Sequence, residues 1–326
     1  MAPMPTGLGF GGSGVGNLRS AIGDDQAHAT ILRALARGVT YFDTAPHYGL
    51  GLSERRIGHA LRDLPRSQYV LSTKAGRLLA PRSTAKVWDD EGFAVPGDLE
   101  RRWDFSFSGV ERSLRESRER LGIERIDIVF AHDPDQAWDT AASDAVRALA
   151  ELRSAGEVAA IGIGTNSTAG LVGLIEQGSL DALMLAGRYT LLDHSAGLPV
   201  LEAAACHGVA VIVAGVFNSG LLATPRPVEG AQFDYSEAHP DTVTKVNRIA
   251  DVCEAHGVDV PTVAFQFARR HRAVTSVVVG MRSPREVDEN ADRFDTVVPA
   301  ALWADLVANG LIDTSVAACG SPGGPG

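Results

Sequence analysis

The sequence predicts an α/β protein that folds as one closed (β/α)8 barrel, the TIM-barrel architecture, over residues 1–316. Short apolar runs recur eight times along the chain, helical patterns separate them, and most runs are apolar throughout. Runs of this kind are typical of parallel strands that are covered on both faces. Eight alternations of strand and helix favour a closed barrel over an open sheet.

The runs and the patterns between them give the expected elements in chain order. The strands are expected at residues 8–12, 40–45, 70–75, 127–132, 160–165, 182–187, 210–215 and 276–280. Helices are expected at residues 24–37, 54–62, 108–121, 141–154, 168–176, 198–207, 241–256 and 262–270. Ser53 and Ser108 are expected to begin the second and third helices, because a serine hydroxyl caps free N–H groups.

Three segments depart from this alternation. Residues 78–107 follow the third strand and show no clear periodicity, which predicts a long loop over the barrel mouth, either a functional lid or a disordered segment. A second long loop, at residues 223–240, follows the seventh strand. Residues 317–326 are rich in Gly and Pro, and we expect a disordered tail there.

Composition excludes several classes of partner. The 326 residues include 30 Lys and Arg against 40 Asp and Glu, a net charge of −10, which disfavours nucleic acids and anionic membranes. The longest apolar run, residues 209–217, is too short to span a bilayer. With no signal-peptide pattern and with Cys206, Cys253 and Cys319 far apart, we expect a cytoplasmic protein with reduced thiols and no metal site. No uncovered apolar helix demands a partner, so we expect a monomer or a weak homo-oligomer.

Four chemically useful side chains follow neighbouring strands. Asp43 and Tyr48 lie at the end of the second strand, Lys74 near the end of the third, and His132 at the end of the fourth. Catalytic residues of barrel enzymes lie at the carboxyl ends of strands, and adjacent strands are about 4.8 Å apart. We therefore expect these four side chains to meet over the barrel axis.

The segments FDTAPHYG, STKAG and FAHDPD resemble the active-site segments of the aldo-keto reductases. The resemblance covers almost the whole chain and assigns the family's catalytic tetrad to Asp43, Tyr48, Lys74 and His132. HDPD, GRYTLLD and GVFNSGLL are similar to the branch of aldose 1-dehydrogenases that act on L-fucose-type sugars and D-threo-aldoses, with pyridoxal 4-dehydrogenases close by. The resemblance implies an enzyme that oxidises such an aldose at C1 to the lactone.

The tetrad chemistry also follows from the residue types. Tyr48 would exchange a proton with the substrate oxygen, and a nearby Lys74 ammonium would lower the pKa of the phenol. Asp43 would keep Lys74 charged and oriented, and His132 would hydrogen-bond the substrate oxygen. Taken one at a time, each residue could instead serve the fold or the surface.

Hydride transfer needs a cofactor, and the resemblance implies NAD or NADP. It gives the cofactor-binding residues as Gly12, Thr165, Asn166, Phe217, Asn218, Ser219, Gly220, Leu222, Gly280, Arg282, Glu286 and Asn290. The Asn218–Gly220 turn is expected to expose N–H groups to the pyrophosphate, although it could be an ordinary turn. Glu286 stands where NADP-selective relatives often carry Arg, which favours NAD, while Arg282 leaves NADP open. Ala186 and Ala214 replace a Gln and a stacking Tyr that usually contact the cofactor.

The substrate site is less clear from the sequence. His47, Trp103 and Phe105 could line a sugar pocket, as could Trp88 and Tyr235, or could pack the lid instead. A pyridoxal dehydrogenase or carbonyl reductase on the same tetrad stays open, and so, more remotely, does a cofactor-binding regulatory subunit without turnover. The GxGxxG match at residues 9–14 is not expected to bind a dinucleotide, because no full strand precedes it.

Overall fold

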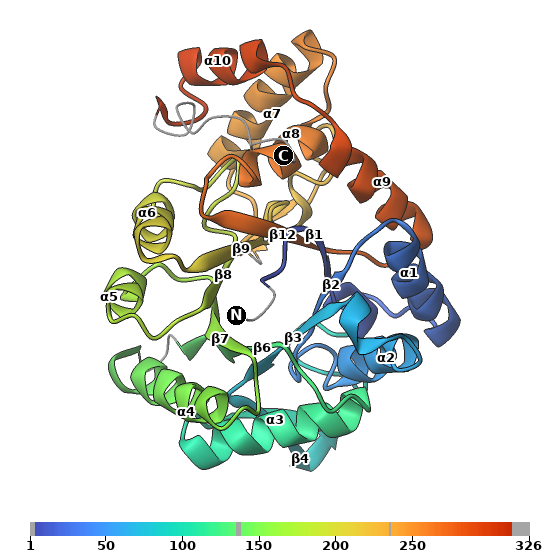
Figure 1. Ribbon diagram of the computed structural model, residues 1–326. Helices are drawn as coiled ribbons and strands as arrows, with labels where there is room; N and C mark the ends of the chain where they lie inside the picture. Colours follow the sequence, from blue (N-terminus) through green and yellow to red (C-terminus); the bar gives the residue numbers. More distant parts are fainter. Residues whose placement is uncertain (1–3, 135–137, 235, 315–326) are drawn as a thin grey trace.

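The computed structural model describes residues 4–134, 138–234 and 236–314. Eight parallel strands close into a barrel, and the helices lie around its outside (Figure 1). The barrel strands are β1 (Gly7–Gly11), β2 (Tyr41–Asp43), β3 (Val70–Ala75), β6 (Ile128–His132), β7 (Ala160–Thr165), β8 (Ala182–Ala186), β9 (Ala210–Ala214) and β12 (Val274–Gly280). They pair in the order β1, β12, β9, β8, β7, β6, β3, β2. The predicted (β/α)8 barrel is confirmed; the predicted tail at 317–326 lies outside the described residues.

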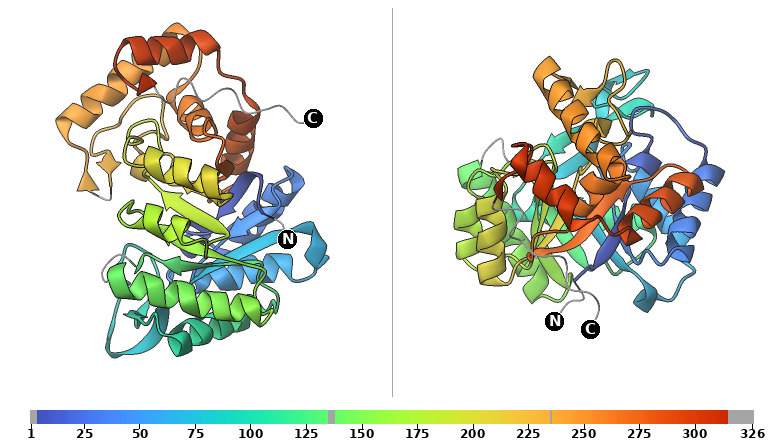
Figure 2. Two further views of the ribbon diagram at one scale, coloured as in Figure 1. Left: turned by 60° about the vertical axis from the view of Figure 1, so that its left-hand side comes forward. Right: turned by 90° about the horizontal axis from the view of Figure 1, so that it is seen from above.

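Helices cover the barrel on all sides, as the two turned views also show (Figure 2). They are α1 (Asp24–Ala36), α2 (Leu52–Leu61), α3 (Phe107–Leu121), α4 (Ser143–Ser154), α5 (Leu171–Glu176), α6 (Leu198–His207), α7 (Pro240–Ala255), α8 (Val260–Ala268), α9 (Pro284–Asp295) and α10 (Ala300–Ala308). The ring closes where α1 lies beside α9, and Arg37 pairs with Asp288 and Asp292 across that contact at 2.8 and 2.7 Å. No described helix is long and apolar enough to cross a bilayer.

Two predicted helix caps are each wrong by two residues. Gly51, with φ of 81°, precedes α2, and the Ser53 hydroxyl instead bonds the buried Thr44 hydroxyl at 2.8 Å. Ser106, not Ser108, caps α3, since its hydroxyl accepts from the Gly109 N–H at 3.1 Å. Helices α9 and α10 were not predicted.

The segment after β3 differs most from its prediction. Instead of an irregular loop it forms an antiparallel hairpin of β4 (Arg77–Lys86) and β5 (Gly97–Trp103), and we call residues 77–103 the insertion. Its side chains Leu79, Phe93 and Val95 form an apolar cluster with Leu50 of the barrel mouth. The insertion is therefore packed onto the mouth. In the described part of the second long connection, β10 (Gln232–Phe233) and β11 (Ser236–Glu237) form a short hairpin. A 3-10 turn at Asn218–Gly220 precedes this connection.

The barrel interior explains where the polar side chains of the mouth come from. Residues that alternate along the strands, among them Tyr41, Phe130 and Met184, fill the interior as one apolar cluster. Because side chains on the same face of a strand recur every second residue, Asp43 and His132 lie on the same inward face, one layer higher. The strands therefore end in an inward-facing polar layer at the barrel mouth.

Candidate active site

The four predicted catalytic side chains meet at the carboxyl ends of three adjacent strands, β2, β3 and β6. The Lys74 ammonium lies 2.6 Å from Asp43 Oδ2 and 3.0 Å from the Tyr48 hydroxyl. The rings of Tyr48 and His132 are 6.0 Å apart and nearly perpendicular. The expected meeting of the four residues is found in the structure.

Local bonds hold this arrangement in place. Ser72 donates to Asp43 Oδ1 at 2.7 Å, so both oxygens of the Asp43 carboxylate are bonded. Lys74 makes a third hydrogen bond, to the Thr44 carbonyl at 3.1 Å. The turn that returns Tyr48 to the axis needs glycine at position 49, where φ is +62° and a Cβ would lie 2.1 Å from the Gly16 carbonyl oxygen.

Burial dominates the electrostatics of the tetrad. Asp43 is 2% and Lys74 3% exposed, and burial raises the pKa of Asp43 although Lys74 opposes this. Burial opposes the charge of Lys74, but the carboxylate and the phenol oxygen raise its pKa above the ordinary value. Burial likewise raises the pKa of Tyr48, and Lys74 lowers it by less. Lys74 therefore lowers the pKa of the phenol as predicted, but burial outweighs this effect, and the net pKa of Tyr48 lies above its ordinary value.

Two histidines beside Tyr48 are kept neutral. Burial, and then the Arg77 guanidinium, hold the pKa of His132 well below its ordinary value and lower that of His47 to about 2. Their rings lie 5.5 Å apart and nearly perpendicular. A neutral His132 can donate one hydrogen bond to a substrate oxygen without adding charge to the site.

This burial predicts acid sensitivity through His47. As the pH falls below about 6.5 the unfolded chain protonates this imidazole, while the folded chain, with a pKa of about 2, does not. The contribution of the buried, neutral His47 to the free energy of unfolding is thus fully present above pH 6.5 and is lost progressively below it. Between pH 7 and 5 we expect His47 to lower the free energy of unfolding by about 2 kcal/mol.

Urea unfolding at pH 7 and pH 5 measures this effect. The difference between the free energies of unfolding at pH 7 and pH 5 should be about 2 kcal/mol smaller in His47→Gln than in the unmodified protein. The His207→Gln variant is the control, because it removes an exposed imidazole at the end of α6 instead of a buried one. An equal pH difference in His47→Gln and the unmodified protein would contradict a buried neutral His47.

The predicted cofactor residues occupy the opposite arc of the mouth. Thr165 ends β7, Asn218–Gly220 follows β9, Gly280 ends β12, and Glu286 lies in the first turn of α9. Gly12 follows β1, but it packs tightly: a Cβ there would lie 2.7 Å from the Asp43 carbonyl oxygen. The predicted cofactor residues therefore line the arc of the mouth that the tetrad leaves open, with Gly12 and Thr165 at its two ends beside β2 and β6.

The turn after β9 has its expected place but not its expected free donors. Asn218, Ser219 and Gly220 all have positive φ, at 44°, 59° and 101°. The N–H groups of Asn218, Gly220 and Leu222 nevertheless bond to carbonyls within the turn at 2.9 to 3.1 Å. These N–H groups are therefore not free to form the predicted array of exposed donors.

Two guanidinium groups give this arc the positive charge that a dinucleotide pyrophosphate needs. Arg19 donates to the Ser219 carbonyl at 2.7 Å, and Arg282 donates to the Ser20 carbonyl at 2.8 Å. Neither forms a salt bridge with a carboxylate in the described part of the chain. Asn218 adds a buried amide oxygen that has no partner among the described residues. These groups fit NAD or NADP.

The predicted substrate residues form two groups: Trp103 and Phe105 lie together, with their rings 5.8 Å apart, whereas His47 lies at the tetrad. His47 lies against Tyr48, at 5.8 Å between rings, and Trp103 stacks on Arg77 at 4.2 Å. Phe105 packs on Gly76, where φ is +101° and a Cβ would touch its ring. Trp88 is 62% exposed on the insertion, and Tyr235 lies outside the described residues.

Sequence reasoning missed three side chains at this mouth. Phe93 of the insertion lies 5.1 Å from the His47 ring and 6.1 Å from the Tyr48 ring. Arg77 pairs with Asp133, the residue directly after His132. The signals available were Arg77 three residues after Lys74 and Asp133 beside His132, whereas nothing in the sequence singled out Phe93.

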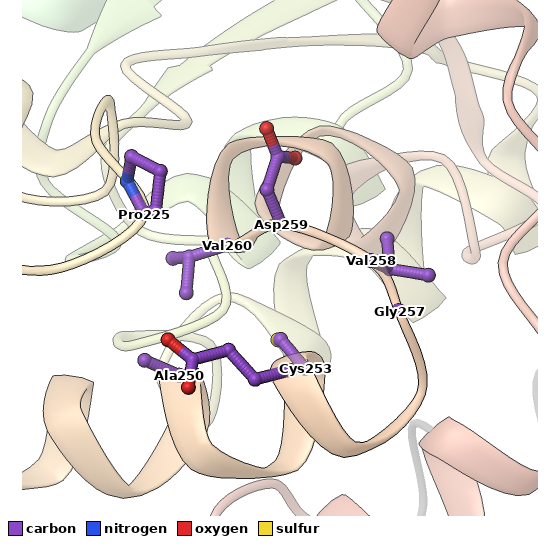
Figure 3. Close-up of a pocket in the computed structure, with 8 residues that line it drawn as sticks. Pro225, Ala250, Cys253, Gly257, Val258, Asp259 and Val260 are labelled. Carbon is purple, nitrogen blue, oxygen red and sulfur yellow. The ribbon is translucent and has the colours of Figure 1, made fainter.

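A separate hollow of about 270 Å³ lies between α7, the start of α8 and Pro225, away from all of these residues (Figure 3). Cys253 lines it, and burial raises the pKa of this thiol to about 12, which disfavours a metal-binding thiolate. Gly257, with φ of 68°, follows His256, the C-cap of α7. No group of three or more potential metal ligands occurs in the described residues.

Comparisons with known proteins place this architecture among relatives. The Aldo/keto reductase family model matches residues 7–308. The chain is 43% identical over 311 residues to a D-threo-aldose 1-dehydrogenase of a Pseudomonas species, covering 94% of each chain. It is 35% identical over 325 residues to the pyridoxal 4-dehydrogenase of Microbacterium luteolum, again covering 94% of each.

Solved structures agree on the fold. An aldo-keto reductase from Bacillus halodurans, in its holo form, superposes with a TM-score of 0.75 at 22% identity, covering 97% of this chain and 94% of that one. The glycerol dehydrogenase of Gluconobacter oxydans superposes with a TM-score of 0.76 at 22% identity, covering 100% and 98%. At such identity the likeness shows the barrel alone.

Proposed function

This chain belongs to the aldo/keto reductase family and is therefore an oxidoreductase, and from that premise we propose that it oxidises an aldose at C1 to the lactone. NAD(P) is the cofactor that the family uses. The observation that carries the reaction type is the contact of Lys74 with both Asp43 and Tyr48. The 43% identity to an enzyme named D-threo-aldose 1-dehydrogenase supports the sugar as substrate.

The proposed proton carrier is Tyr48. In oxidation the C1 hydroxyl gives its proton to the phenolate oxygen of Tyr48, and C1 loses its hydrogen with the bonding electron pair to become a carbonyl carbon. When bound, NAD(P) supplies the nicotinamide that accepts this hydride, or returns it in reduction. His132, neutral and buried, holds the substrate oxygen near the phenol.

Lys74 and Asp43 act on Tyr48 rather than on the sugar. Lys74 stabilises the phenolate through its 3.0 Å hydrogen bond, and Asp43 balances the ammonium charge in a buried site. Because burial raises the pKa of Tyr48, the neutral phenol prevails near pH 7. Oxidation needs the phenolate and should therefore accelerate as the pH rises above neutral, whereas reduction uses the phenol form.

A substrate panel tests this proposal. Reduced cofactor is followed at its ultraviolet absorbance with L-fucose, L-galactose, D-arabinose or pyridoxal and with NAD or NADP. Turnover of an aldose, faster at pH 9 than at pH 7, supports the proposal. The 35% identity to a pyridoxal 4-dehydrogenase favours that activity as the second candidate, and turnover of pyridoxal alone would replace the sugar while keeping the tetrad.

We also propose that NAD is favoured over NADP, with Glu286 as the discriminating residue. Its carboxylate accepts the Arg282 backbone N–H at 2.8 Å, which fixes it at the start of α9. A carboxylate so placed would repel a 2′-phosphate and accept from ribose hydroxyls. Replacing Glu286 with Gln should narrow the preference for NAD by about tenfold, a typical change for one charge interaction of about 1.4 kcal/mol.

Fluorescence titration of both cofactors measures this preference. Glu289→Gln is the matched control. Glu289 lies on the same helix, three residues after Glu286, and forms an ion pair with Arg285 at 2.5 Å. Tighter binding of NADP to the unmodified protein, or an equal effect of the two variants, would count against the role given to Glu286.

A further inference from the structure

Arg77 lies at the mouth beside the tetrad and has no role in the chemistry described above. It begins the insertion, directly after the turn that ends β3, and is 9% exposed. Its guanidinium stacks on Trp103 and is the charged group with the largest effect on both His47 and His132. Arg77 is therefore close to the two imidazoles that flank Tyr48.

Hydrogen-bond donors of Arg77 are left over for a ligand. One terminal nitrogen, Nη2, bonds the Asp133 carboxylate. The other, Nη1, lies 3.9 Å from Glu91 Oε2, which is beyond hydrogen-bond distance. The Nε–H is buried and has no acceptor among the described residues. Because protein atoms cover Nε, Nη1 is the donor that a bound molecule could reach.

The charges at this side of the mouth are balanced. Arg77 is matched by Asp133, Arg101 by the fully buried Asp89, and Lys74 by Asp43. Glu91 adds a further carboxylate within 4 Å of both arginines. This arc contrasts with the cofactor arc, where Arg19 and Arg282 lack carboxylate partners among the described residues. A phosphorylated substrate would thus find no unmatched cation here, whereas a neutral hydroxyl group finds donors and acceptors.

We propose that Arg77 determines specificity by donating hydrogen bonds to a hydroxyl oxygen of an uncharged polyhydroxylated substrate, with Asp133 and Trp103 holding the guanidinium in position. This inference rests on the proposed oxidation of an aldose and identifies the class of aldose as unphosphorylated. It gives the insertion a defined part in the site, because Arg77 and Trp103 are paired neighbours across β4 and β5.

The test compares Arg77→Gln with Arg82→Gln. Arg82 lies on the same strand and makes the same kind of contact, an ion pair with Asp90 at 2.6 Å, but its other hydrogen bond goes to the Leu99 carbonyl within the insertion. The activities compared are oxidation of L-fucose or D-arabinose and reduction of benzaldehyde, which has no hydroxyl groups. Hydrogen bonds to charged groups are worth about 10- to 150-fold in an equilibrium, so Arg77→Gln should lower kcat/KM for the aldose by that factor.

The loss for the aldose should be at least about tenfold greater than the loss for benzaldehyde, and Arg82→Gln should show no such difference. For the unmodified enzyme, D-arabinose should have a kcat/KM at least about tenfold above that of D-arabinose 5-phosphate. Thermal unfolding checks that the variants are folded. If Arg77→Gln does not fold, Asp133→Asn, which keeps the side-chain size, takes its place. Its loss of kcat/KM should be smaller, but again greater for the aldose than for benzaldehyde.

Two failures are distinguishable. If the unmodified enzyme oxidises aldoses but Arg77→Gln affects aldose and benzaldehyde equally, or the phosphorylated sugar is the better substrate, the role of Arg77 is wrong and the proposed function stands. If the unmodified enzyme oxidises no aldose, the proposed function and the inference both fall.

Discussion

Replacing Tyr48 with Phe should lower kcat by about 10²- to 10⁴-fold in both directions of the reaction, while the protein still folds and binds its cofactor. The change removes one oxygen atom, the one that lies 3.0 Å from Lys74 and that we propose moves the proton. The ring stays, so its packing against Phe93 and His132 is kept. Initial rates of aldose oxidation and aldehyde reduction, with cofactor titration by fluorescence, measure both effects.

Tyr69→Phe is the matched control for this experiment. Tyr69 is also a buried phenol, but it precedes β3, at the opposite end of that strand from the tetrad. Its variant should keep normal turnover. Turnover of Tyr48→Phe within about tenfold of the unmodified enzyme would contradict the role of Tyr48.

Replacing Lys74 with Met should be costly for the fold as well as for the reaction. It leaves the Asp43 carboxylate buried without its ammonium, and breaking a buried ion pair on one side typically costs about 3–5 kcal/mol. Turnover should fall to the level of Tyr48→Phe, because the phenolate loses its stabilising donor. Urea unfolding at pH 7 gives the loss of stability.

A double variant separates the two consequences. Asp43→Asn combined with Lys74→Met removes both charges, so it should recover most of the stability but none of the activity. Lys86→Met is the control, because it removes a lysine from an exposed ion pair. The side chains of Lys86 and Asp90 are each about half exposed, so their ion pair should contribute less than about 1 kcal/mol to stability. A stable Lys74→Met protein would contradict the buried ion pair at the centre of the site.

The barrel could be predicted because the fold depends on a repeated signal. Each strand is buried on both faces and reads as a continuous apolar run, so all of the predicted strands overlap the observed ones. Helix α9 was missed because it is mostly charged, with only Val287, Asn290 and Ala291 buried. The insertion was missed because Pro and charged residues interrupt its alternation, and its hairpin is stabilised by the cluster that it forms with Leu50 at the mouth.

The tetrad could be located because each member sits in a recognisable segment at a strand end. What the sequence could not supply was the balance of opposing effects: whether burial or Lys74 decides the pKa of Tyr48 depends on three-dimensional packing. The same holds for the Asn218–Gly220 turn, whose N–H groups bond within the turn. Arg77 and Phe93 reach the site from the insertion, so their contacts exist only once that segment is folded onto the mouth.

The central claim is that C1 of an aldose loses a hydride while Tyr48 takes the hydroxyl proton, and an isotope experiment tests it most directly. L-Fucose carrying deuterium at C1 is incubated with the enzyme and NAD, and the reduced cofactor and the sugar product are examined by mass spectrometry. The account predicts deuterium in the reduced cofactor and an unlabelled lactone, with transfer abolished in Tyr48→Phe. Deuterium retained in the sugar product, or transfer undiminished in Tyr48→Phe, would contradict it.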